Sequence, residues 1–176
     1  MKEARRKLTS YYTFFIVRDP IDRLVSAFRN KFHSNYRGSD VHFKPYARAI
    51  LRQNRRHISR EALARLDDMR FSEFIKYLLS RPPHFNSHWE MYHKLCQPCA
   101  IKYDFIGKYE TMSQDVSYVL ERIGVNISFP QRYQHSTFPK MYLTGTSRAD
   151  LRKIRELYAM DYELFGYKFH IPDSII

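Results

Sequence analysis

The sequence has no long apolar run and no Walker-type phosphate loop. Its 176 residues contain apolar stretches of only a few residues, whereas a membrane-spanning helix needs roughly 20. Residues 1–10 are basic and lack the apolar region of a signal peptide. The Gly107-Lys108 pair has no glycine five residues earlier and is followed by Tyr109. We therefore expect no membrane anchor within this chain and no nucleotide binding of the Walker type.

Cysteine is scarce, and this limits the metal chemistry that the chain can carry. The two cysteines, Cys96 and Cys99, form a single CxxC, which is weak evidence for zinc because zinc usually takes four ligands. The pair also precedes a predicted strand rather than the start of a helix, unlike thioredoxin-type motifs. His84, His88 and His93 surround Trp89, but without convincing ligand spacing. We expect no metal site.

Acidic residues are few relative to basic ones. Lys and Arg number 30 against 18 Asp and Glu, giving a net charge of +12 and a pI near 9.8. Such a surface attracts polyanions, which include nucleic acid, anionic lipid and sulfated or carboxylated sugars. It is equally compatible with a solvated basic face that binds nothing. No nucleic-acid-binding motif accompanies the charge, so we do not expect nucleic acid as a partner.

The remaining composition is that of one globular domain, residues 1–176, with a sizeable core. Residues 14–17 form a short apolar run rich in aromatic and β-branched residues, which predicts a buried parallel strand. Asp19 is suited to cap a following helix and Pro20 to occupy its first position. Within residues 20–32 the spacing of the apolar side chains predicts a buried stripe made of Leu24, Val25, Phe28 and Phe32.

This strand–turn–helix unit is suited to bind an anion. Arg18 follows the predicted strand, where ligands of open α/β sheets bind, and its planar fork fits a phosphate. The helix start adds unpaired N–H groups, and Ser26, two turns into the helix, adds a hydroxyl. In the alternative interpretation, Arg18 pairs with Asp19 or Asp22 and Ser26 only packs.

The second half of the chain predicts another strand–helix unit, as expected for a parallel sheet. Residues 100–108 read as a buried strand, and residues 111–114 as a capping box. The next helix would end at Gly124 and bury four apolar residues: Val116, Val119, Leu120 and Ile123. Further helices are predicted over 41–56, from Phe71 to the Pro82-Pro83 pair that ends it, and over 147–157. An arginine-rich surface between residues 48 and 65 either lines a ligand groove or faces solvent.

Three blocks of the sequence resemble one protein family. IVRDPIDRLVSAFRNKF (residues 16–32) resembles the 3′-phosphate-binding motif of the Golgi carbohydrate sulfotransferases, in the branch with the chondroitin, dermatan and N-acetylgalactosamine 4-O- and HNK-1 sulfotransferases. HWEMYHKLCQPCAIKYDFIGKYETM (88–112) and YAMDYELFGY (158–167) resemble the same branch. The blocks occur in the family's order and extend over most of the chain.

The resemblance implies an α/β fold of the P-loop-NTPase-like sulfotransferase type. This fold has a parallel sheet flanked by helices, and here we expect it to be N-terminally truncated and helix-rich. It implies a carbohydrate O-sulfotransferase that takes the sulfuryl group from PAPS (3′-phosphoadenylyl sulfate), uses no metal, and acts on a glycan hydroxyl. Arg18 and Ser26 map onto the residues that hold the 3′-phosphate. The family's 5′-phosphosulfate loop has no copy here, so we expect an N-terminally truncated, C-terminal portion of such an enzyme. A catalytically inactive module that binds a nucleotide or polyanion is the alternative.

The resemblance also suggests the catalytic base. His88 maps onto the family's His-Trp element, and a neutral imidazole is suited to deprotonate a sugar hydroxyl. Glu110 is the rival candidate for the base, and a packing role for His88 is the third possibility.

The resemblance also implies a cellular location. Family members work in the Golgi lumen, with a membrane anchor in their longer forms. That oxidising setting favours disulfide chemistry for Cys96 and Cys99, with their partners left open, and would make Asn126-Ile127-Ser128 a glycosylation acceptor.

Overall fold

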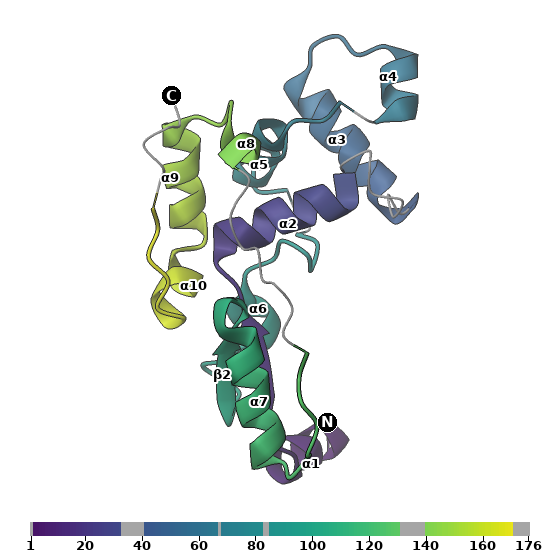
Figure 1. Cartoon of the computed structure of the whole chain (residues 1–176). Helices are drawn as coiled ribbons and strands as arrows, with labels where there is room; N and C mark the ends of the chain where they lie inside the picture. Colours follow the sequence, from purple (N-terminus) through teal and green to yellow (C-terminus); the bar gives the residue numbers. More distant parts are fainter. Residues whose placement is uncertain (1, 33–40, 67, 83–84, 131–139, 171–176) are drawn as a thin grey trace. The chain divides into compact units, whose positions relative to one another are not determined.

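The structure, a computed structural model, describes residues 2–32, 41–66, 68–82, 85–130 and 140–170 (Figure 1). It divides into two compact units. The first unit comprises Met1–Asp19 and Met91–Thr137, and the second comprises Pro20–Glu90 and Phe138–Ile176. The prediction of one domain over residues 1–176 stays a prediction. None of the helices in the described ranges is long and apolar enough to cross a membrane.

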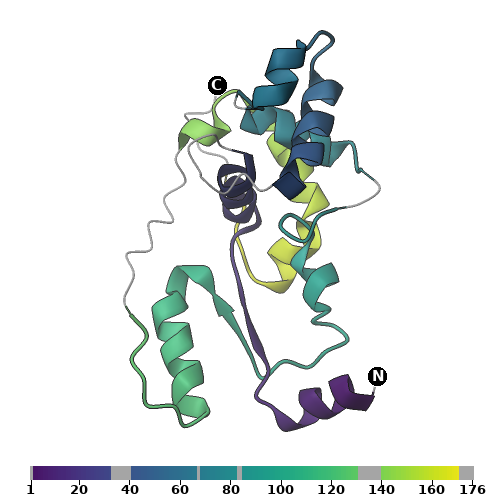
Figure 2. The same cartoon turned by 90° about the vertical axis from the view of Figure 1, so that its right-hand side faces the viewer.

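The first unit contains the strands. Its described elements are α1 (Lys2–Ser10), β1 (Phe14–Val17), α6 (Tyr92–Cys96), β2 (Phe105–Lys108), the 3₁₀-helix η2 (Tyr109–Thr111) and α7 (Met112–Arg122). The two strands pair in parallel, with Phe14 opposite Phe105 and Val17 opposite Lys108. Helix α7 runs beside the strands in both views (Figures 1 and 2). The predicted α/β class and parallel pairing are thus confirmed.

Two carboxylates fix the ends of this strand pair. Asp104 accepts hydrogen bonds from the Thr13 backbone N–H (2.7 Å) and hydroxyl (3.0 Å), and these bonds lower the pKa of the Asp104 carboxyl group. Asp115 of α7 accepts from the Lys108 N–H (2.6 Å) and the Thr111 hydroxyl (2.7 Å). The first carboxylate joins the amino ends of the strands, and the second joins β2 to α7.

Four sequence predictions for this unit are wrong. The strand predicted over 100–108 begins only at Phe105, and the strands are not fully buried: Ile106 is 40% and Phe14 44% exposed. The physical reason is that strand side chains are buried only where other elements cover the two faces of the sheet, and in the described ranges the small sheet, with α7 packed on β2, leaves Phe14 and Ile106 uncovered. The capping box fails because the Thr111 hydroxyl donates to Asp115 and makes no cap bond. Among the predicted inward residues of α7, only Val119 is buried.

The second unit is helical and has an aromatic core. Its described elements are α2 (Pro20–Phe32), the 3₁₀-helix η1 (Val41–Phe43), α3 (Lys44–Asn54), α4 (Arg60–Arg65), α5 (Phe71–Leu79), α8 (Lys140–Leu143), α9 (Arg148–Leu157) and α10 (Ala159–Leu164). Helix α2, viewed nearly along its axis in Figure 2, starts at Pro20 and buries the predicted stripe. The rings of Phe32 and Phe74 lie 5.9 and 5.4 Å from Trp89, centroid to centroid. Trp89 is fully buried.

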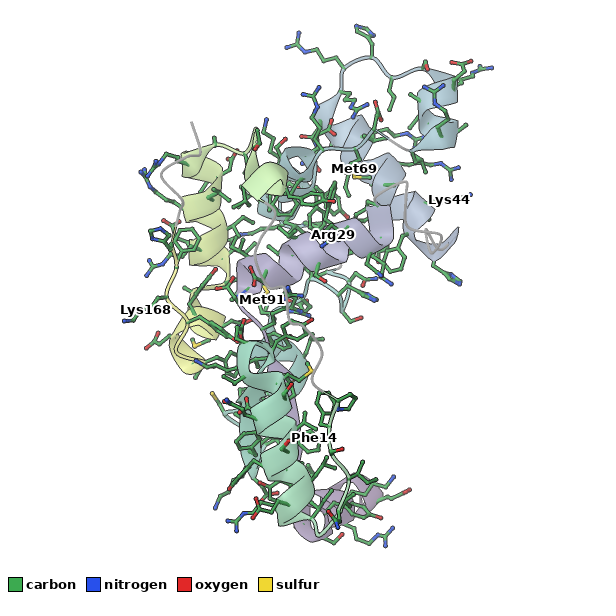
Figure 3. All side chains as sticks on the ribbon, in the orientation of Figure 1. Phe14, Arg29, Lys44, Met69, Met91 and Lys168 are labelled. Atoms are coloured by element: carbon green, nitrogen blue, oxygen red, sulfur yellow. The ribbon has the colours of Figure 1, made fainter. Side chains whose placement is uncertain are left out.

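One of the arginines between residues 48 and 65 is structural. Arg55 donates to Glu73 (2.7 and 2.9 Å) and to Asp68 (2.7 Å), and the bond to Glu73 is the main reason why the pKa of Arg55 is raised. This ion pair joins the end of α3 to the start of α5. The other arginines of the segment are exposed: Arg48, Arg52, Arg56, Arg60 and Arg65. Side chains with nitrogen tips extend outward from α3 and α4 in Figure 3, as expected for a solvated basic surface.

Residues 86–90 form a turn, the Asn86–Glu90 turn, that is held by hydrogen bonds of its own and by Arg23 of α2. The Asn86 carbonyl accepts from the N–H groups of Trp89 (2.9 Å) and Glu90 (2.8 Å). Arg23 of α2 donates to the carbonyl oxygens of Ser87 (2.7 Å) and Glu90.

The third anchor of the turn is Tyr158, which follows α9. Its hydroxyl donates to the carbonyl oxygen of Trp89. Tyr158 is only 1% exposed, and burial raises the pKa of its hydroxyl, so the hydroxyl keeps its proton and remains a donor. Arg23 of α2 and Tyr158 after α9 therefore both bind main-chain oxygens of the turn.

Replacing Tyr158 by Phe should destabilise the second unit. The change keeps the buried ring but leaves the Trp89 carbonyl without this donor, which should cost about 1–3 kcal/mol in the free energy of unfolding. Urea denaturation followed by Trp89 fluorescence measures it. Tyr11, which is 61% exposed, supplies the control: Tyr11→Phe should change stability by less than about 0.5 kcal/mol. Equal stabilities of Tyr158→Phe and the parent chain would contradict the role of this hydrogen bond.

Candidate functional site

Arg18 lies where the sequence predicts it, directly after β1. Its guanidinium carbon is 4.3 Å from the centroid of the Tyr109 ring, and Tyr109 directly follows β2. Because the strands are parallel, both residues lie at the carboxyl edge of the sheet. Stacking uses the flat face of a guanidinium, whereas a phosphate binds along its N–H edge. The observed orientation of Arg18 is therefore compatible with phosphate binding.

Ser26 lies in the middle of α2, half-buried beside the buried stripe of that helix. It belongs to the second unit, whereas Arg18 belongs to the first. The structure thus confirms the strand that Arg18 follows and, separately, the helix that carries Ser26. Their joint binding of one phosphate stays a prediction.

Glu110, the rival candidate for the base, has a contact within the first unit. Its carboxylate oxygen Oε1 accepts a hydrogen bond from the backbone N–H of Asp19 at 3.3 Å. The side chain is exposed and follows Tyr109 in η2. The bond joins the chain after β1 to the chain after β2, which gives Glu110 a structural role at the same edge of the sheet as Arg18.

His88, the preferred candidate, lies in the Asn86–Glu90 turn of the second unit with a defined ring orientation. Its backbone N–H donates to the side-chain oxygen Oδ1 of Asn86 at 3.0 Å, and its ring nitrogen Nδ1 lies 2.6 Å from the same oxygen. The edge of the ring meets the Phe43 ring, with the centroids 5.2 Å apart and the planes at 90°. The residue is nevertheless exposed overall, so an external molecule can reach it.

The surroundings of His88 favour its neutral form. Partial burial lowers the pKa of the imidazole, and the positive charges of Lys31 and Arg23 lower it further. Lys31 is held nearby, with its ammonium nitrogen 4.6 Å from the centroid of the Phe43 ring. A neutral imidazole can accept a proton, so His88 remains competent as a general base at a lower pH than an unperturbed histidine.

The cysteines and histidines do not assemble a metal centre within the described ranges. No group of three His, Cys, Asp or Glu side chains there is placed to hold an ion. Cys96 and Cys99 form no disulfide in the structure, so the disulfide expected from the resemblance is absent between the two.

Sequence reasoning missed the residues around His88. The only local signal is the Asn-x-His spacing, because Asn side chains often accept from the N–H two residues further on. Arg23 and Tyr158 lie 64 or more residues away from the carbonyl groups that they bind. No pattern in one sequence shows contacts over that separation.

Comparison with known proteins gives one consistent result. The family model described as "Sulfotransferase family" matches residues 1–168. Carbohydrate sulfotransferase 11 of mouse (Mus musculus) is 39% identical over 176 residues, covering 94% of this chain and 49% of that protein. Carbohydrate sulfotransferase 14 of zebrafish (Danio rerio) is 37% identical over 174 residues, covering 94% and 46%.

Human carbohydrate sulfotransferase 9 is 37% identical over 180 residues, covering 95% of this chain and 40% of that protein. The chain therefore spans about half the length, or less, of these relatives. No solved structure gives a significant match. The family match extends over both units of the structure and includes Arg18, Ser26 and His88, and on this evidence the chain belongs to the sulfotransferase family.

Proposed function

We propose that the chain supplies the 3′-phosphate-binding and acceptor-activating parts of a PAPS-dependent carbohydrate O-sulfotransferase. The observation that carries the proposal is the position of Arg18, which directly follows strand β1 and is separated from the start of helix α2 only by Asp19. The relatives, all named carbohydrate sulfotransferases, make a glycan the expected acceptor.

Arg18 and Ser26 would bind the 3′-phosphate of PAPS. The Arg18 guanidinium can form two parallel charge-assisted hydrogen bonds with phosphate oxygens while its face stays on Tyr109. The Ser26 hydroxyl can add a weaker, neutral donor. The same contacts would hold adenosine 3′,5′-bisphosphate, the product left after sulfuryl transfer, so binding of this product tests the donor site without catalysis.

His88 would activate the acceptor. The Nε2 atom of the neutral imidazole takes the proton of a sugar hydroxyl as the hydroxyl oxygen attacks the sulfur of PAPS in line. The bond between sulfur and the bridging phosphate oxygen breaks, and adenosine 3′,5′-bisphosphate leaves with that electron pair. The charge that develops on the bridging oxygen needs cationic groups close to it.

The acceptor we propose is a glycosaminoglycan or an N-acetylgalactosamine-type glycan. The net charge of +12 and the exposed arginines of α3 and α4 would attract a carboxylated or sulfated sugar chain. The proposed place of action is the Golgi lumen. Asn126 is exposed just after α7, where a glycosylating enzyme could reach it.

Replacing Arg18 by Ala should weaken binding of adenosine 3′,5′-bisphosphate about 10- to 100-fold, because charge-assisted hydrogen bonds to the phosphate are lost. Isothermal titration calorimetry measures the dissociation constant. Arg122 is the matched control: it stacks on Tyr118 with its guanidinium carbon 5.6 Å from the ring centroid, in the same unit. Arg122→Ala should leave the affinity unchanged. Equal affinities of Arg18→Ala and the parent chain would rule out the proposed donor site.

Replacing His88 by Gln should reduce sulfuryl transfer by about 10²- to 10⁴-fold, the usual contribution of a general base. The rate of sulfuryl transfer is measured as incorporation of label from radiolabelled PAPS. The acceptors are desulfated chondroitin, desulfated dermatan and N-acetylgalactosamine-terminated glycans. His88→Gln should still bind adenosine 3′,5′-bisphosphate. The control is His57→Gln, at an exposed position in the same unit, which should keep full activity. Product binding without transfer in the parent chain would instead indicate a catalytically inactive nucleotide-binding module.

A further inference from the structure

We propose that Asn86 is a positioning residue that fixes the tautomer of His88, so that Nδ1 carries the hydrogen and Nε2 presents the lone pair that accepts the acceptor's proton. The inference rests on the proposed role of His88 as the base. It adds Asn86 to the proposed site, with the task of orienting the His88 ring.

The orientation of the Asn86 amide follows from the backbone. The His88 main-chain N–H can only donate, and it lies 3.0 Å from Oδ1 of Asn86. The amide must therefore present its oxygen, and not its NH₂ group, to His88. The usual ambiguity between the two ends of an Asn side chain is removed by this one contact.

The tautomer of His88 follows from the amide. The ring nitrogen Nδ1 lies 2.6 Å from the same Oδ1 oxygen, and an amide oxygen can only accept. Nδ1 must consequently carry a hydrogen. A neutral imidazole has one hydrogen on its two nitrogens, so Nε2 is left as the acceptor.

The turn that carries both residues is fixed by groups other than the Asn86 side chain. Arg23 binds the carbonyls of Ser87 and Glu90, and Tyr158 binds the carbonyl of Trp89. The Trp89 side chain is fully buried among four aromatic rings: Phe32, Phe43, Tyr46 and Phe74. The backbone thus holds the His88 N–H in place, and the Asn86 side chain aligns the ring with it.

A neutral amide suits this task better than a carboxylate. The groups that act on His88 from α2 are the cations Lys31 and Arg23, and η1 contributes the uncharged Phe43 ring. The amide oxygen selects the tautomer without adding a negative charge. A carboxylate at the same place would stabilise the imidazolium and keep the base protonated.

The test is NMR of the full chain labelled with ¹⁵N-histidine, with the His88 signals assigned by their loss in His88→Gln. Long-range ¹H–¹⁵N correlations report which ring nitrogen is protonated, and a pH titration gives the His88 pKa. We expect the parent chain to show Nδ1 protonated and Nε2 bare in the neutral ring. Asn86→Ala should show a mixture of tautomers, because no acceptor then selects Nδ1–H.

Asn86→Asp should raise the His88 pKa by about one to three units, since a carboxylate within hydrogen-bond distance favours the charged ring. Its carboxylate still accepts from the His88 N–H, so this variant keeps the contact between side chain 86 and the His88 backbone. Asn126→Asp makes the same charge change at an exposed position of the first unit and should leave the titration of His88 unaltered. An Nε2–H tautomer in the parent chain, or an unchanged His88 pKa in Asn86→Asp, would overturn the inference.

The pH profile of sulfuryl transfer separates this inference from the proposed function. If His88 is the base, the acid limb of the kcat/KM profile, which reports the free chain, should move to higher pH in Asn86→Asp by the same amount as the pKa measured by NMR. A shifted pKa with an unmoved acid limb would uphold the tautomer assignment and overturn His88 as the base.

Discussion

The burial of Trp89 is the constraint on which the second unit depends. Its side chain is inaccessible to solvent and packs against rings from α2, η1, α3 and α5. When a tryptophan side chain is buried, the polar main-chain groups beside it are also withdrawn from water, and each buried carbonyl then needs a hydrogen-bond donor. Tyr158 donates to the Trp89 carbonyl, and Arg23 donates to the carbonyls of Ser87 and Glu90 in the same turn. The exposed residue His88 is thus covalently joined to a fully buried side chain of the unit.

This arrangement gives a physical reason why the three sequence blocks that resemble the family occur together. Arg23 comes from the first block, His88 and Trp89 begin the second, and Tyr158 begins the third. Their hydrogen bonds meet at the Asn86–Glu90 turn. Loss of any one donor would leave a carbonyl of the turn without it, and the imidazole would lose its fixed position. The blocks therefore act together, although they are far apart in the chain.

Sequence patterns predicted the parts of the fold that depend on local preferences. The start of α2 at Pro20 and its buried stripe are encoded by neighbouring residues, as is the Ser147 cap of α9, whose hydroxyl accepts from the Asp150 N–H at 3.0 Å. The exposure of Phe14 and Ile106 was not predictable, because it depends on how many strands and helices surround the sheet. The site divides in the same way. Arg18 was found from its place after a strand, whereas Asn86, Arg23 and Tyr158 act on the His88 turn through backbone geometry and long-range contacts that residue spacing does not report.

Arg23 and Tyr158 bind the Asn86–Glu90 turn through hydrogen bonds to main-chain carbonyl oxygens. Every amino acid has this carbonyl group. The identity of the side chain at position 87 is therefore of no consequence to Arg23, which binds only the oxygen of that residue. Ser87 is exposed and lies next to His88. Evolution can consequently exchange this side chain with no displacement of the neighbouring imidazole. Under the proposed function, position 87 would be a place where acceptor preference can change while the base stays fixed.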